Sequence, residues 1–214
     1  MRRLAVLVIG VVLVANVVFA EDYNPPPWTR GGPGTTYQKW EFGASGVTPP
    51  ADEVGQGNPG PSSLIVHDTG TATVWMPTVT PAAGVPEASG VWKIGSSDSI
   101  EITIQNFDEQ NPYKEIWLQM AWWSDENPVI YATVPGGTGE LWPVLVDQQS
   151  PGWNLATWKW HIEPNPEAET IIISPGLCAL YVDQIVIDTI CVPEPTTICL
   201  LGLGALALLR KRRP

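Results

Sequence analysis

The stretch S-I-E-I-T-I-Q-N-F at residues 99–107 decides the fold class of the chain. Isoleucine occupies every second position from Ile100 to Ile104, and polar side chains occupy the positions between them. Successive side chains of a strand point to opposite faces, so this period of two predicts a strand with one buried face and one exposed face. The stretch E-I-W-L-Q-M-A-W-W at residues 115–123 alternates in the same way and predicts a second strand.

Further short runs of this kind are separated by segments rich in glycine and proline, and no segment shows a helical period. Long loops are expected at residues 48–62 and 77–90. Many short strands with turn signals between them predict an all-β fold, and we expect an antiparallel β-sandwich that is jelly-roll-like in topology. The other predicted strands are Thr36–Phe42, Ser63–His67, Thr71–Met76, Val91–Ile94, Val129–Val134, Pro143–Asp147, Ala156–Glu163, Thr170–Ser174 and Tyr181–Ile190.

The N-terminal end has the pattern of a secretory signal peptide. Arg2 and Arg3 precede an apolar segment that ends in Val-Phe-Ala at residues 18–20. We therefore expect a signal helix over residues 1–20, which signal peptidase removes by cutting between Ala20 and Glu21. An uncleaved N-terminal anchor is the alternative. Residues 21–35 are rich in proline and glycine and are expected to form an extended leader.

The C-terminal end carries three features in a fixed order. Pro193-Glu194-Pro195 comes first, an uncharged segment from Ile198 to Leu209 follows, and Arg210-Lys211-Arg212-Arg213 comes last. The prolines prevent a helix from extending backward into the folded domain. A 12-residue helix is about 18 Å long, which is less than the thickness of about 30 Å of the hydrocarbon core of a bilayer. We therefore expect a transmembrane helix that is shorter than usual. By the positive-inside rule, the basic residues set the topology and stay in the cytoplasm.

This arrangement resembles the PEP-CTERM sorting signal over about residues 192–213, with Val192 and the Pro-Glu-Pro tripeptide as its sorting motif. The resemblance implies an exported bacterial protein whose Pro-Glu-Pro region is recognised by exosortase. It also implies that the tail anchors the protein in the membrane at least transiently, before the protein reaches the cell surface or the extracellular matrix. Such proteins are typically linked to biofilm or exopolysaccharide. An ordinary single-pass anchor is the alternative.

These features divide the chain into a signal peptide (1–20), a leader (21–35), a β-sandwich domain (36–191) and a sorting signal (192–214). Between the two terminal segments, five basic residues face 21 acidic residues, so the body has a net charge of −16. A surface of that charge repels phosphate backbones, which excludes nucleic acid as a partner. Cations and neutral glycans remain compatible partners, and the acidity also keeps an exported protein soluble.

Eleven tryptophans are an excess for a chain of 214 residues. Most are expected in the core. Exposed ones can stack on sugar rings or pack against a neighbouring protein. In the strand at 115–123, the alternation puts Trp117, Gln119 and Trp123 on the face opposite the aliphatic residues. We therefore predict that a glycan-stacking surface, if the domain has one, contains these three residues.

Catalytic signatures are absent from the sequence: there is no nucleophile elbow, no paired-histidine helix and no phosphate loop. We expect no enzyme and no cofactor. A structural calcium ion is considered only for the acidic stretches at 108–111 and 124–127, which are otherwise solvated loops. Cys178 and Cys191 flank a predicted strand, so a disulfide between them requires the chain to fold back.

The sequence therefore predicts an exported, non-catalytic protein of the cell surface or extracellular matrix. Its β-sandwich is expected to contact polysaccharide or other proteins. The alternatives are a dedicated carbohydrate-binding module and, less favoured, a secreted glycoside hydrolase, which would need two facing carboxylates in a cleft.

Overall fold

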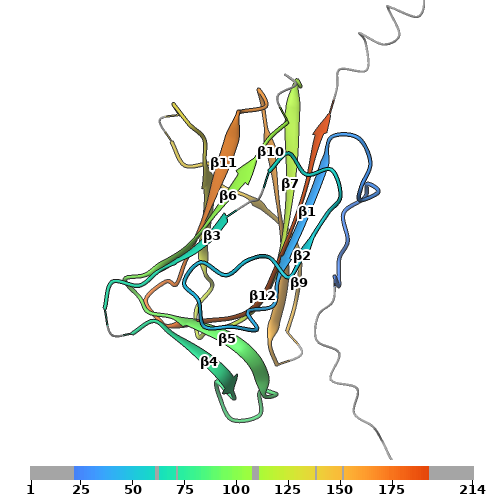
Figure 1. Ribbon diagram of the computed structural model, residues 1–214. Helices are drawn as coiled ribbons and strands as arrows, with labels where there is room; N and C mark the ends of the chain where they lie inside the picture. The colour runs from blue at the N-terminus through green and yellow to red at the C-terminus, as the bar shows by residue number, and fades with distance from the viewer. Residues whose placement is uncertain are drawn as a thin grey trace, which may run out of the picture.

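The computed structural model describes residues 22–60, 63–70, 72–107, 111–137, 139–150 and 152–192. This part of the chain is all-β, with twelve strands in two antiparallel sheets and no helix (Figure 1). The prediction of an all-β, antiparallel, sandwich-like fold is therefore confirmed. The predicted signal helix and C-terminal transmembrane helix lie outside the described residues, and the jelly-roll topology stays a prediction.

The larger sheet has eight strands in the order β2-β1-β12-β7-β10-β9, and β5 also pairs with β12 and β4 with β5. Its centre is β12, which pairs with β7 along eleven positions and with β1 along six. The strands are β1 (Thr35–Trp40), β2 (Glu53–Val54), β4 (Val74–Val79), β5 (Ala88–Ile94), β7 (Tyr113–Trp123), β9 (Val144–Gln149), β10 (Asn154–Ile162) and β12 (Leu180–Val192).

The smaller sheet has four strands in the order β3-β6-β11-β8. These are β3 (Ser63–His67), β6 (Ser99–Gln105), β8 (Val129–Thr133) and β11 (Ala168–Ser174). The alternation that opened the sequence analysis is realised in β6, where Ile100, Ile102 and Ile104 are fully buried. Leu64 of β3 and Ile171 of β11 flank Ile102 in the register.

The main core fills the space between the two sheets. It is built from one face of each strand, which explains why the period of two in the sequence is so regular. From the larger sheet it takes Ile116, Leu118, Met120 and Trp122 of β7, and Ile185 and Ile187 of β12. A second, smaller cluster lies under β4 and β5 and contains Val79, Ala88, Val91 and Trp153.

Both predicted loops contain strand residues: the short strand β2 lies within residues 48–62, and β4 and β5 extend into residues 77–90. The expected loop at residues 77–90 is wrong, because β4 runs on to Val79 and β5 begins at Ala88, so the two strands form a hairpin. The apolar residues of this hairpin are divided between the two clusters: Trp92 and Ile94 belong to the main core, whereas Val79, Ala88 and Val91 belong to the second cluster. Its prolines and glycines indicated one long loop, but only Pro81, Gly84 and Pro86 lie in the connection at residues 80–87, whereas Pro77 belongs to β4 and Gly90 to β5.

No helix long and apolar enough to cross a membrane is found among the described residues.

Candidate functional site

The predicted stacking residues do not form an exposed surface. Trp117 and Gln119 do lie on the outer face of β7, but the leader covers them, leaving Trp117 8% and Gln119 2% exposed. Trp123 is half-buried and packs edge-on against Tyr181, with 5.6 Å between ring centroids. The strand alternation identified the right face, but it could not show that other segments of the chain cover that face.

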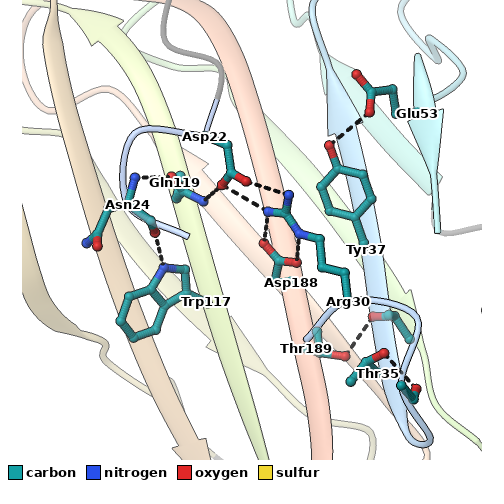
Figure 2. Close-up of polar contacts among 12 residues, drawn as sticks. Asp22, Asn24, Arg30, Thr35, Tyr37, Glu53, Trp117, Gln119, Asp188 and Thr189 are labelled. Atoms are coloured by element: carbon teal, nitrogen blue, oxygen red, sulfur yellow. Dashed lines mark hydrogen bonds and ion pairs between the residues drawn. The ribbon is translucent and has the colours of Figure 1, made fainter. Parts of the chain in front are cut away.

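Hydrogen bonds with Trp117 and Gln119 of β7 hold the leader on this face (Figure 2). The Trp117 Nε1–H donates to the Asn24 carbonyl at 2.7 Å. The Gln119 Oε1 accepts from the Asn24 amide at 3.0 Å, and its Nε2 donates to Asp22 at 2.6 Å. Asn24 also donates from Nδ2 to the Thr157 hydroxyl of β10 at 3.1 Å. This amide and indole are therefore used in holding the leader.

Arg30 is the centre of a second set of leader contacts, shown in Figure 2. It donates from Nε and Nη2 to both carboxylate oxygens of Asp188 on β12, at 2.5 and 2.6 Å. It also donates from Nη1 and Nη2 to Asp22, at 2.5 and 2.9 Å. Its guanidinium carbon lies 3.9 Å from the centroid of the Tyr37 ring on β1. Planar, bidentate pairing of this kind is the strongest form of ion pair in proteins.

The electrostatics of this cluster rest on a buried carboxylate. Asp188 has no exposed surface, whereas the Arg30 side chain is about a quarter exposed. Burial raises the pKa of the Asp188 carboxyl, and the hydrogen bonds and charge of Arg30 oppose that rise. The guanidinium thus offsets the cost of placing a carboxylate inside the fold. We name Asp22, Asn24, Arg30, Trp117, Gln119 and Asp188 the leader clamp.

Of the 11 tryptophans, only Trp142 is exposed, at 59%. Its ring centroid lies 5.7 Å from that of Tyr131 on β8, and it is two residues before the start of β9, an edge strand of the larger sheet. The apolar residues Val144, Leu145 and Val146 of β9 are exposed as well. Trp142 and these three residues, with Tyr131, form an apolar strip at one edge of the sandwich, and we refer to it as the β9 strip.

One carboxylate has a strongly perturbed proton affinity. Burial, with a smaller contribution from Glu41, raises the pKa of Asp183 to about 7. Glu41 is itself paired with Lys39, at 2.6 Å between Nζ and the carboxylate. Neither Asp183 nor Glu41 lines the open cavity of about 630 Å³ at the end of the sandwich, which is bounded by residues 134–136, 141 and 162–167. The carboxylates that line this cavity are Glu163 and Glu167 instead.

Metal ligands do not converge in the part of the chain that the structure describes: no three His, Cys, Asp or Glu side chains group there as an ion would need. Residues 108–110 of the first acidic stretch lie outside this part. In the second stretch, Glu126 accepts a hydrogen bond from the Leu177 amide at 2.8 Å. Cys178 and Cys191 are both free thiols.

Another polar cluster lies between the two sheets and was not predicted from the sequence. Lys114 of β7 and Glu169 of β11 are both fully buried, and their charged groups are 2.7 Å apart. Asn106, which follows β6, contacts both of them. The sequence offered one signal for this cluster: Lys114 is one of only five basic residues in the body. Its position in the apolar alternation of the strand could not reveal that its partner lies in the other sheet.

The comparisons with known proteins agree with the position of the sorting residues. Residues 192–213 match the PEP-CTERM protein-sorting motif, while the comparisons with curated proteins and with solved structures gave no match for the chain. Val192, where the match begins, is the last residue of β12. The other motif residues, the basic residues 210–213 and the expected cleavage site at Ala20 and Glu21 lie outside the described residues. The chain therefore carries a PEP-CTERM sorting motif at residues 192–213, which marks it as an exported protein that exosortase sorts and that its tail anchors at least transiently.

Proposed function

We propose that this chain is a non-catalytic protein of the cell surface or extracellular matrix, delivered there by its C-terminal sorting motif. The motif match at residues 192–213 carries this proposal. The body supports it, because the face of β7 on which the predicted stacking residues lie is occupied by the leader clamp. The function of the body is then to make contacts rather than to turn over a substrate.

The β9 strip supports a role in contacts with matrix components. Exposed apolar side chains gathered at a sheet edge are unusual on a soluble monomer and mark interaction surfaces. The strip is uncharged from Trp142 to Val146, although the body around it is strongly acidic. A neutral polymer or the apolar surface of another matrix protein fits such a strip better than a polyanion does.

The first experiment is the intact mass of the protein recovered from its native host. We expect a C-terminus between Val192 and Pro195, with added glycan or lipid mass if the new end is attached to the surface. A variant with neutral residues in place of Arg210, Lys211, Arg212 and Arg213 is the control, and it should lose this processing because its topology signal is gone. A wild-type mass that runs through Pro214 would contradict sorting by removal of the tail.

A dedicated carbohydrate-binding module is the second candidate function, and the exposed Trp142 beside Tyr131 favours it. A sugar ring can stack on an exposed indole through its apolar face. Because Trp117 and Gln119 are covered and Trp123 is half-buried against Tyr181, Trp142 is the one exposed tryptophan for such a site.

We expect Trp142→Ala to weaken binding to the host exopolysaccharide about tenfold, as loss of one aromatic contact implies. Binding is measured by cosedimentation of the purified protein with the polysaccharide. The matched control is Leu177→Ala, which removes an exposed apolar side chain from the connection between β11 and β12. Equal binding by wild type and both variants would exclude a glycan site at Trp142 and leave protein contacts for the β9 strip.

A further inference from the structure

The cluster of Lys114, Asn106 and Glu169 consists of a buried ion pair and an amide that contacts both of its charged groups. All three side chains are buried, at 0%, 8% and 0% exposure, and they come from three segments of the two packed sheets. A buried ion pair alone is weak evidence for stability, because the cost of removing both charges from water offsets their attraction. The third member, an amide in contact with both charged groups, changes what the cluster can do.

The amide of Asn106 is oriented by its partners. Its Nδ2 donates to Glu169 at 2.8 Å, to the Pro166 carbonyl at 2.5 Å and to the Asn165 side chain at 3.5 Å. All three partners are oxygen acceptors, which fixes Nδ2 on that side and leaves Oδ1 toward Lys114. The Lys114 Nζ contacts this Oδ1. Because Oδ1 is about 1.2 Å from Cγ, the amine nitrogen lies beside the carbonyl carbon.

Glu169 connects the two nitrogens of the cluster. Its Oε2 accepts from the Lys114 Nζ at 2.7 Å, and its Oε1 accepts from the Asn106 Nδ2 at 2.8 Å. One carboxyl group can therefore take a proton from the amine with one oxygen and deliver a proton to the amide nitrogen with the other. This is the geometry of general acid–base catalysis of amine attack on an amide.

From this geometry we infer that Lys114 and Asn106 form an intramolecular isopeptide bond, with Glu169 as the catalytic acid and base. In the buried pair a proton passes from the ammonium to Glu169, giving a neutral amine and a carboxylic acid. The Nζ–Cγ bond forms as Nζ gives a second proton to the Glu169 carboxyl group, and the Cγ–Nδ2 bond breaks as that group returns one proton to Nδ2. Ammonia leaves, and Glu169 ends as a neutral acid beside a neutral amide. No oxidant or cofactor is required.

The surroundings support each step. Burial lowers the pKa of the Lys114 amine, which favours the uncharged nucleophile. Burial also raises the pKa of the neighbouring Cys191 thiol, so this sulfur stays protonated and does not compete. Asn165 and Pro166, which hold the departing nitrogen, both line the open cavity at this end of the sandwich and so provide an exit for ammonia.

The bond would join the two sheets close to the C-terminal end of β12, from which the sorting motif continues. Asn106 follows β6 of the smaller sheet, and Lys114 belongs to β7 of the larger one. Lys114 is paired in the register with Cys191, the next-to-last residue of β12, just before the sorting motif begins. The cross-link therefore lies at the end of the domain from which the C-terminal tail departs, where neither free cysteine supplies a covalent bond.

Peptide mapping of the full-length protein tests this inference. Trypsin cuts unmodified protein after Lys93 and Lys114 and releases peptide 94–114, which contains Asn106. The cross-link removes the charge of Lys114, so we expect no cut there and instead a peptide 94–159 that is lighter by one ammonia, about 17 Da. Lys159, whose ion pair with Glu115 is partly exposed, is the internal control and should be cut normally.

Two variants separate the chemistry from folding. Glu169→Gln keeps the size of the side chain but cannot relay a proton, and Asn106→Ala removes the electrophile. Both variants should therefore release peptide 94–114 without a cross-link, at the mass calculated from each variant's own sequence. Full cross-linking in Glu169→Gln would overturn the catalytic role of Glu169. If the variants do not fold, the wild type decides alone: cooperatively folded wild-type protein with an unmodified peptide 94–114 overturns the inference.

Discussion

Replacing Arg30 with methionine should lower the free energy of unfolding by about 3 kcal/mol, because it leaves a buried carboxylate without its partner. Asp188 is fully buried and receives two hydrogen bonds from Arg30. Methionine keeps much of the length and apolar surface of the side chain, so the loss reports the charge. The same change removes both hydrogen bonds from Arg30 to Asp22, which keeps only the one from Gln119, and should loosen the leader on β7.

The pH dependence of the stability loss in Arg30→Met tests whether the loss comes from the unpaired Asp188 carboxylate. Without the guanidinium, the pKa of Asp188 in the folded state rises further above its unfolded value of about 3.9. The folded state then binds more protons than the unfolded state between these two values, so stability falls as the pH rises through that window. The deficit of Arg30→Met relative to wild type should therefore be smaller at pH 4 than at pH 7.

Urea unfolding at both pH values measures these differences, and a protease that cuts after aromatic residues measures release of the leader at Tyr23 and Trp28. The matched control is Lys159→Met, which breaks the partly exposed pair with Glu115 and should cost less than about 1 kcal/mol. Equal losses in the two variants, or a leader that stays protected in Arg30→Met, would contradict the role given to the clamp.

The fold class could be predicted from sequence because burial follows the strand period. Every second residue of β6 is an isoleucine, and each of them is fully buried. The hairpin of β4 and β5 could not be predicted in the same way, since its apolar residues are divided between two clusters and prolines occur both in β4 and in the connection to β5. Strand order was also beyond reach, because pairing depends on contacts between segments far apart in the chain.

The site residues show the same division between local and non-local information. Alternation placed Trp117 and Gln119 on the correct face of β7, but their partner Asn24 is more than 90 residues away in sequence. Arg30 and Asp188 are separated by 158 positions, and no local pattern relates them. The sorting motif, by contrast, is contiguous, which is why the sequence alone was sufficient to identify it.

The tail is attached to the best-supported strand of the domain. β12 is the longest strand, with 13 residues, and it lies between β1 and β7 in the larger sheet (Figure 1). A protein held at the surface by its C-terminus carries any load through this strand. Since both edges of β12 are hydrogen-bonded to neighbours, such a load is shared by two ladders of backbone hydrogen bonds. The architecture thus suits attachment at this end.

Replacing Ile187 of β12 with alanine should therefore be among the most damaging single changes, with a loss of about 3 kcal/mol in the free energy of unfolding. Ile187 is 1% exposed and faces the main core, so the substitution removes buried methyl groups and leaves a cavity that the rigid sheets cannot close.

The matched control is Ile190→Ala on the same strand. Ile190 is half-buried on the opposite face, so its loss should be about 1 kcal/mol or less. Urea unfolding of the two variants measures both values, and a loss at Ile190 equal to that at Ile187 would contradict the assignment of the core face of β12.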